Sequence, residues 1–217
     1  MLQFITDYNS EVPVSEQVKR VLAGGGNWIQ IRMPGATDAE ISGVVEDIMP
    51  ACLEKQAFLL LTDHVDEAKT LNVGGAVLSL KSETLPSKAR VFLGAAAVVA
   101  VSVNNIEDVR AVRSLDVDCV ILTPFRGKDT GNPDAPELGV EGVRSLIKAM
   151  HDEEIMIPTV AAGDIRFDDI APLFDAGISG LAVSSAIADA PDITVETAQW
   201  VSELAKYERR ERKEVGL

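Results

Sequence analysis

Short apolar runs alternate with longer amphipathic stretches from one end of the chain to the other. Short apolar runs are typical of parallel strands buried on both faces, and apolar positions at helical spacing in the longer stretches predict helices. The predicted strands are Leu2–Thr6, Trp28–Arg32, Phe58–Thr62, Ala76–Leu80, Val98–Ser102, Cys119–Leu122, Thr159–Ala162 and Gly180–Val183. The predicted helices begin near Ser15, Thr37, Asp63, Glu83, Asn105, Val140, Phe167 and Ser184.

This regular alternation predicts the fold class. Strands and helices that alternate with short links favour parallel pairing through right-handed crossovers. An open doubly wound sheet could hold the same pattern, but so many repeats within 217 residues fit a closed barrel better. The sequence therefore predicts an α/β protein with a single (β/α)8 TIM-barrel domain over residues 1–217.

The second predicted helix carries both a start signal and a break. Thr37 to Glu40 reads Thr-Asp-Ala-Glu, which is the pattern of a capping box ahead of an apolar run. Pro50 lies farther along the same stretch. Since proline cannot donate a backbone hydrogen bond, we expect it to interrupt or kink this helix.

The composition mainly excludes certain classes of binding partner. The formal net charge of -14 argues against binding of nucleic acid or of an anionic membrane. The two cysteines, Cys52 and Cys119, have no metal-ligand spacing and are expected to be reduced thiols packed in the core. No apolar run approaches a membrane span and no targeting segment is evident, so a cytoplasmic location is the expectation.

Polar residues recur where the predicted strands end. In a barrel, side chains at the carboxyl ends of the strands converge on one mouth. Any one of them could be an ordinary helix cap, but their recurrence on one rim indicates a binding site. The link from Thr123 to Gly139 is longer than the others and contains Arg126 and Lys128, so it is a further site candidate.

The junctions after the seventh and eighth strands favour a phosphate site. Gly163 follows a buried strand, and Ser184 and Ser185 stand between strand and helix. At these two positions of a barrel, backbone N–H groups and small side chains often hold a phosphate. Tight turns in the rim are the alternative explanation. Asp164 is unexpected here, because a carboxylate repels phosphate unless it is turned away.

Two charged residues end neighbouring strands. Arg32 follows an apolar run, so its guanidinium needs a carboxylate or phosphate partner. Asp63 is either a ligand of a hard cation or the N-terminal carboxylate of the third helix. His64 and His151 lie in helix-like, solvated stretches, which favours a structural role for both.

With these residues identified, the chain resembles the thiamine phosphate synthase family and its sister thiazole tautomerases. The segments that carry the likeness, in order, are Trp28–Arg32, Leu61–Ala68, Val101–Asn104, Thr123–Phe125, Ile157–Gly163 and Ala182–Ile187. The resemblance implies a (β/α)8 barrel that joins a hydroxymethylpyrimidine diphosphate to a thiazole phosphate and releases pyrophosphate with Mg²⁺. Such chemistry resembles a dissociative substitution, in which the protein mainly binds and neutralises the departing pyrophosphate.

The chain departs from the family pattern on the pyrophosphate side. Pro34 stands where the family has a lysine, and Thr62 replaces the asparagine of an Asn-Asp pair. Ser82 replaces the second magnesium aspartate, and Lys128 is an unaligned replacement for a loop lysine. Asn104 stands where a tautomerase has its histidine.

The resemblance also assigns roles. It gives catalytic roles to Arg32, Lys128 and Ser102, substrate or phosphate binding to Gln30, Arg32, Thr62, Gly163, Asp164, Ser184 and Ser185, and Mg²⁺ binding to Asp63 and Glu83. The expected partner is a small phosphorylated heterocycle, and a homodimer follows only by analogy. The synthase is the first hypothesis. A tautomerase-like isomerase with another base and a non-catalytic phosphate-binding or regulatory relative are the alternatives.

Overall fold

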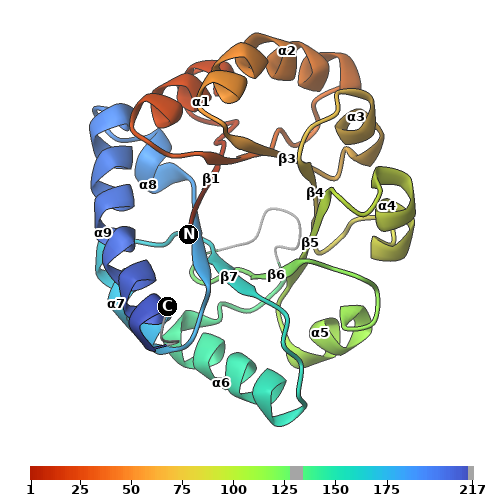
Figure 1. The fold of residues 1–217 in the computed structure, drawn as a ribbon, viewed down its shortest axis with the longest axis vertical. Helices are drawn as coiled ribbons and strands as arrows, with labels where there is room; N and C mark the ends of the chain where they lie inside the picture. Colours follow the sequence, from red (N-terminus) through yellow and green to blue (C-terminus); the bar gives the residue numbers. More distant parts are fainter. Residues whose placement is uncertain (128–133, 215–217) are drawn as a thin grey trace.

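Eight parallel strands close into a barrel, and helices surround it (Figure 1). The computed structural model describes residues 1–127 and 134–214. The strands are β1 (Leu2–Ile5), β2 (Trp28–Ile31), β3 (Phe58–Thr62), β4 (Gly75–Leu78), β5 (Val98–Val103), β6 (Cys119–Leu122), β7 (Thr159–Ala162) and β8 (Gly180–Val183). Each strand pairs with its neighbour in sequence, and β1 closes on β8 with Leu2 opposite Leu181. The predicted TIM barrel is confirmed.

The helices follow the predicted order, with a difference at the end. They are α1 (Val14–Ala23), α2 (Asp38–Glu54), α3 (Val65–Thr70), α4 (Pro86–Leu93), α5 (Ile106–Val112), α6 (Gly139–Asp152), α7 (Ile170–Asp175), α8 (Ser185–Ala188) and α9 (Ile193–Glu214). The helix predicted near Ser184 is split, because the Asp192 carboxylate accepts the Thr194 backbone N–H and starts a second helix. No helix within the described ranges is long and apolar enough to cross a membrane.

Helix α2 continues through Pro50, so the predicted interruption is wrong. Its start is as predicted: the Thr37 hydroxyl accepts the Glu40 backbone N–H, and the Glu40 carboxylate accepts the Thr37 backbone N–H. Ile48 and Cys52 are buried on either side of the proline. Their packing outweighs the backbone hydrogen bond that proline removes.

Alternation along the strands divides the core in two. In β3, Leu60 belongs to a cluster inside the barrel, whereas Leu59 and Leu61 pack with the surrounding helices. The interior cluster takes its buried residues from β3 to β8, and these are Leu60, Val77, Ala100, Ile121, Val160, Ala162 and Ala182. Since these side chains fill the middle of the barrel, space for a ligand remains only toward its ends.

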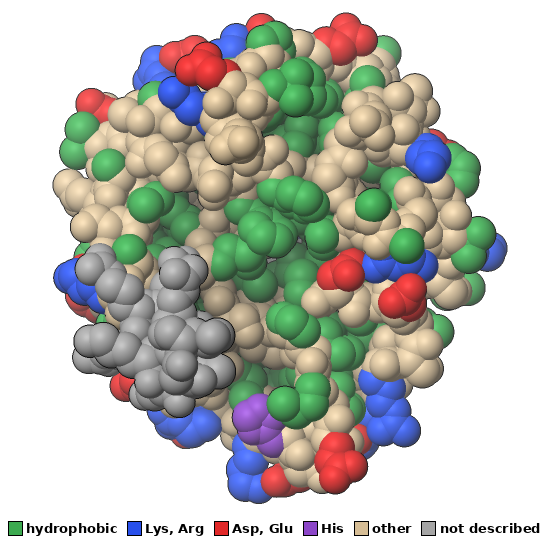
Figure 2. Space-filling view, in the orientation of Figure 1, with side chains coloured by type: hydrophobic (Ala, Val, Ile, Leu, Met, Phe, Trp, Pro, Cys, Tyr) green, Lys and Arg blue, Asp and Glu red, His purple; other side chains and the backbone are tan. Residues whose placement is uncertain are grey.

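The amino-terminal end of the barrel is closed by apolar side chains. Met1, Trp28, Phe58 and Cys119 pack against the interior cluster, and the rings of Trp28 and Phe58 lie 5.0 Å apart. Figure 2 shows hydrophobic side chains gathered in the middle of one face of the molecule. Both cysteines are free, and burial raises the pKa of the Cys119 thiol to about 12. Polar chemistry is therefore left to the opposite end.

Two glycines give a matched test of this packing. A Cβ on Gly75, which has φ +152°, would lie 2.0 Å from the Val98 carbonyl oxygen in the β4–β5 pair, whereas a Cβ on Gly43 of α2 would meet nothing within 4 Å. We expect Gly75→Ala to lower the free energy of unfolding by about 3 kcal/mol or more. Gly43→Ala, in an exposed helix interior, should raise it by about 0.5–1 kcal/mol. Urea unfolding of both variants measures the difference, and equal effects would contradict the described β4–β5 contact.

Candidate functional site

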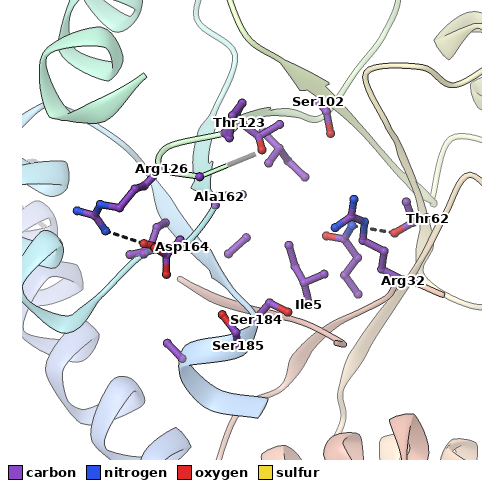
Figure 3. A pocket seen from close by; sticks show the side chains of 18 of the residues that line it. Ile5, Arg32, Thr62, Ser102, Thr123, Arg126, Ala162, Asp164, Ser184 and Ser185 are labelled. Carbon is purple, nitrogen blue, oxygen red and sulfur yellow. Dashed lines mark hydrogen bonds between the residues drawn. The ribbon is translucent and has the colours of Figure 1, made fainter. Parts of the chain in front are cut away.

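The carboxyl ends of the strands surround a cavity of about 210 Å³, here called the mouth cavity. Figure 3 shows Arg32 and Thr62 across it from Arg126 and Asp164, with Ser184 and Ser185 on a third side. The structure brings most of the residues expected from the sequence to this one cavity, and these are Gln30, Arg32, Thr62, Ser102, Gly163, Asp164, Ser184 and Ser185.

One wall of the mouth cavity is an arc of hydroxyl groups. Thr62 ends β3, Ser79 follows β4, Ser102 lies in β5 and Thr123 follows β6, and all four line the cavity. A hydroxyl both donates and accepts hydrogen bonds. This wall can therefore offer either a donor or an acceptor to a polar ligand.

Arg32 supplies an unpaired positive charge. Its backbone is fixed, because its N–H donates to Thr6 Oγ1 at 2.9 Å and its carbonyl accepts the same hydroxyl at 3.2 Å. Among residues 1–127 and 134–214, its guanidinium has no hydrogen-bond or ion-pair partner. A half-buried guanidinium without a carboxylate is a ready partner for an anionic ligand.

The side formed by β7 and β8 is small and polar. In the part of the chain that the structure describes, the hydroxyls of Ser184 and Ser185 have no hydrogen-bond partner. The short helix α8 begins at Ser185, before the long helix α9. Gly163 has φ +112°, and a Cβ there would lie 2.8 Å from the Phe125 backbone nitrogen. Glycine is therefore required where this loop meets the segment after β6.

Arg126 also lines the mouth cavity, but its charge is already paired. Its Nη2 donates to Asp169 Oδ1 at 2.8 Å and its Nη1 to Asp169 Oδ2 at 2.9 Å, and the guanidinium lies 5.0 Å from the Phe125 ring centroid. Burial alone would raise the pKa of Asp169, but hydrogen bonds from Arg126 and the Arg166 backbone together hold it below its usual value. The Asp164 carboxylate is paired with Arg166 at 3.3 Å, which accounts for a carboxylate at this rim.

An adjoining cavity of about 190 Å³ shares Arg32, Thr62 and Ser79 with the mouth cavity and adds Pro34 and Asp63. Asp63 has φ +60°, and its Oδ1 accepts the Ser79 backbone N–H at 2.9 Å. The second expected metal ligand, Glu83, is exposed and lines neither cavity, so the structure does not bring the two carboxylates together there. Lys128 lies outside the described residues.

One histidine and two carboxylates lie together next to Asp63, and this group was not predicted from the sequence. The Nδ1 atom of His64 lies 3.3 Å from Asp38 Oδ1 and 3.7 Å from Glu67 Oε2. Among the described residues, these three alone bring three metal-ligating atoms within 4.8 Å of one another. Only the i, i+3 spacing of His64 and Glu67 was visible in the sequence. Asp38 comes from the start of α2, which the fold places beside α3.

Asn104 is engaged in the structure of the barrel. It is 7% exposed, and its Nδ2 donates to the carbonyls of Thr123 and Pro136, both at 2.9 Å. Its side chain thus ties the two ends of the link after β6 to β5. The family resemblance implies a tautomerase histidine at this position, and an amide side chain cannot replace it as a base.

Comparison with known proteins gives a consistent result. A family model described as thiamine monophosphate synthase matches residues 2–187. The chain is 38% identical over 196 residues to a thiamine-phosphate synthase of Bacteroides fragilis, covering 90% of this chain and 96% of the relative. It is 31% identical to the thiamine-phosphate synthase of Corynebacterium efficiens, covering 88% of each.

A solved structure of similar overall shape is the thiamine phosphate pyrophosphorylase from Pyrococcus furiosus. It superposes with a TM-score of 0.83 at 25% identity, covering 95% of this chain and 96% of the other. The corresponding protein from Bacteroides thetaiotaomicron, at 17% identity and a TM-score of 0.66, supports the fold alone.

The lowered pKa of Asp169 predicts a pH-dependent stability. A carboxyl group whose pKa falls on folding stabilises the folded state above its unfolded pKa of about 4, and this contribution is lost as the pH falls through the folded value. We expect Asp169→Asn to lower the free energy of unfolding by about 1–2 kcal/mol at pH 7. The difference from the wild type should shrink below about pH 4. Urea unfolding at several pH values measures it, with the exposed neighbour Asp168→Asn as the control. A deficit independent of pH would contradict the ion pair.

Proposed function

The chain belongs to the thiamine monophosphate synthase family, and from that premise we propose that it joins a hydroxymethylpyrimidine diphosphate to a thiazole phosphate and releases pyrophosphate. The observation that carries the proposal is the unpaired guanidinium of Arg32. It lies where the mouth cavity and the adjoining cavity meet, so it can reach an anion in either.

The two cavities offer distinct places for the two substrates. The diphosphate would lie toward Asp63 and Arg32, and the monophosphate toward Gly163, Ser184 and Ser185. The hydroxyl arc lies between, with Ser102 and Thr62 beside the pyrimidine. Such an arrangement would put the ring nitrogen of the thiazole close to the methylene carbon that carries the diphosphate.

The reaction depends most on stabilisation of the leaving pyrophosphate. The bond between the methylene carbon and the diphosphate oxygen breaks, and pyrophosphate keeps the electron pair. The thiazole nitrogen then donates its lone pair to the pyrimidine carbocation and forms the new C–N bond. Charge therefore builds up on the pyrophosphate in the transition state, and Arg32 would neutralise part of it.

Magnesium fits this site with fewer protein ligands than the family resemblance implies. Mg²⁺ is commonly held by one or two carboxylates, substrate phosphates and water. Asp63 would supply the carboxylate and the diphosphate the other anionic ligands, whereas we assign no ligand role to Glu83. When bound, the ion supplies further charge neutralisation on the leaving pyrophosphate.

Pyrophosphate release from the purified protein tests the proposal, with both substrates present and with or without Mg²⁺. Metal-dependent release of pyrophosphate together with thiamine phosphate is the expected result. Binding of the thiazole phosphate without turnover would instead favour the non-catalytic alternative. Proton exchange at the thiazole ring carbon, followed by NMR, would favour the isomerase.

Arg32→Gln should slow the reaction with little loss of stability. Removing the charge that faces the leaving group is expected to lower kcat/KM about 100-fold, or about 2.7 kcal/mol of transition-state stabilisation. Arg32→Lys should retain part of the activity, because it keeps the charge and loses the planar fork. The control is Arg20→Gln on α1, which removes an exposed pair with Glu16 and should leave kcat/KM unchanged. An equal effect of the two glutamine variants would exclude Arg32 from the site.

Asp63→Asn separates the charge of the metal ligand from its structural role. An asparagine keeps the oxygen that accepts the Ser79 backbone N–H and loses the negative charge. We expect the Mg²⁺ concentration for half-maximal release to rise about 10-fold or more, since affinity for a hard cation depends on ligand charge. Asp66→Asn, an exposed neighbour on α3, is the control. An unchanged Mg²⁺ requirement would remove Asp63 as a ligand.

A further inference from the structure

A buried chain of polar side chains leads from inside the barrel to the mouth cavity. Gln3 of β1 is 2% exposed and Gln30 of β2 is 3% exposed. Gln3 Nε2 donates to Gln30 Oε1 at 2.8 Å, and Gln30 Nε2 donates to Thr62 Oγ1 at 2.8 Å, a bond drawn at Thr62 in Figure 3. Gln30 and Thr62 line the cavity, whereas Gln3 does not and can act only through Gln30.

This polar pair departs from the rest of the barrel interior. β3 to β8 contribute an apolar cluster to the interior, and the polar side chains of these strands that face the mouth cavity, such as Thr62 and Ser102, are hydroxyls rather than amides. Burying two amides is costly unless each is hydrogen-bonded, and apolar side chains would fill the same space at lower cost. Stability alone therefore gives no reason for Gln3, and its contact with a cavity residue points to a role at the ligand.

In the structure, the hydrogen bond from Gln3 goes with one orientation of the Gln30 amide. A glutamine by itself can present either its oxygen or its NH₂ group to a ligand. Because Gln3 donates, the Gln30 oxygen turns toward Gln3 and the NH₂ group turns toward Thr62. One of the two Nε2 hydrogens goes to Thr62, and among the described residues the second has no acceptor, which leaves it for a ligand in the cavity that Gln30 lines.

We propose that Gln3 is a positioning residue that holds Gln30 as a hydrogen-bond donor toward an acceptor nitrogen of the aminopyrimidine ring. The substrate assignment rests on the proposed function, and the orientation of the amide is the one seen in the two hydrogen bonds of Gln30. Gln3 thereby favours a heterocycle with an acceptor nitrogen over one that presents a donor at that position.

A third buried glutamine provides a matched control. Gln17 is 0% exposed, and its Nε2 donates to the backbone carbonyls of Asp7 and Val12, both at 2.7 Å. It does not line the mouth cavity. Replacing Gln17 with leucine thus removes a buried amide of the same kind at a residue that has no contact with Gln30 and does not line the site.

Calorimetric binding of hydroxymethylpyrimidine diphosphate to the full chain, with Mg²⁺ present, is the primary measurement. Gln3→Leu should weaken this binding about 10-fold, the loss expected for one misdirected hydrogen bond, and leave thiazole phosphate binding within about twofold. Gln17→Leu should lower the unfolding temperature and leave both affinities unchanged. Equal pyrimidine affinity in the wild type and Gln3→Leu would overturn the role of Gln3.

Gln3→Glu gives a readout that a structural role would not move. A protonated glutamate donates to Gln30 as Gln3 does, whereas an ionised one only accepts and would turn the Gln30 NH₂ group away from Thr62. Burial raises the pKa of such a carboxyl, so the change should fall between about pH 5 and pH 8. The ratio of wild-type to variant affinity should rise with pH over this range, and a constant ratio would count against the proposal.

The two proposals fail differently. A wild type that binds the pyrimidine diphosphate but releases no pyrophosphate would contradict the proposed function and leave the Gln3 comparison intact. A wild type that releases pyrophosphate while Gln3→Leu binds and turns over equally well would contradict the role of Gln3 alone. A wild type that does not bind the pyrimidine diphosphate would overturn both.

Discussion

Closure of the parallel sheet is the constraint on which the remaining structure depends. A closed barrel removes both sheet edges and forces alternate side chains of every strand into a narrow interior. That interior is filled by one or two residues from each of β3 to β8, such as Leu60, Val77 and Ile121. The ligand space must then lie at the mouth, and any polar side chain below it must find its partner on a neighbouring strand. Gln3 and Gln30 meet that requirement through each other.

The charges around the mouth explain how an acidic chain can receive anionic substrates. The overall charge is -14, yet the cavity contains Arg32, whose guanidinium has no partner among the described residues, and a rim of small residues that includes Gly163, Ser184 and Ser185. Arg126, the other described cation of the cavity, is neutralised by Asp169 and holds the loops together. Acidic groups gather instead on the side of Asp63, near Asp38 and Glu67. Under the proposed function, the side of Ser184 and Ser185 would suit a phosphate without a metal ion, and the side of Asp63 would suit a phosphate that binds together with Mg²⁺.

The sequence predicted those parts of the fold and site that depend on local patterns. Apolar runs located all eight strands to within about two residues, and strand ends located Arg32, Gly163 and Ser184 at the rim. Contacts between distant segments were not predictable. The bonds of Arg126 to Asp169 and of Gln3 to Gln30 depend on the barrel register, and the approach of Asp38 to His64 depends on helix packing. Glu83 was expected to be a metal ligand because it follows Ser82, where the family has its second aspartate. Its place in the fold could not be predicted from the sequence, and it lines neither cavity.

The departures from the family pattern form a coherent set when viewed through these contacts. Pro34 lines the adjoining cavity in place of a lysine, so Arg32 is the cation that the described residues offer to a diphosphate there. Under the proposed function, a smaller protein charge would leave more of the leaving-group charge for a metal ion, which Asp63 would hold. Thr62 has lost the amide of the family's asparagine, but its hydroxyl still accepts the Gln30 NH₂ group and keeps a hydrogen to donate. The substitution therefore leaves the Gln30 NH₂ group in the orientation described above. Under our proposals, recognition of the pyrimidine ring would then depend on Gln3 of β1, and binding of the diphosphate would depend more on the metal ion.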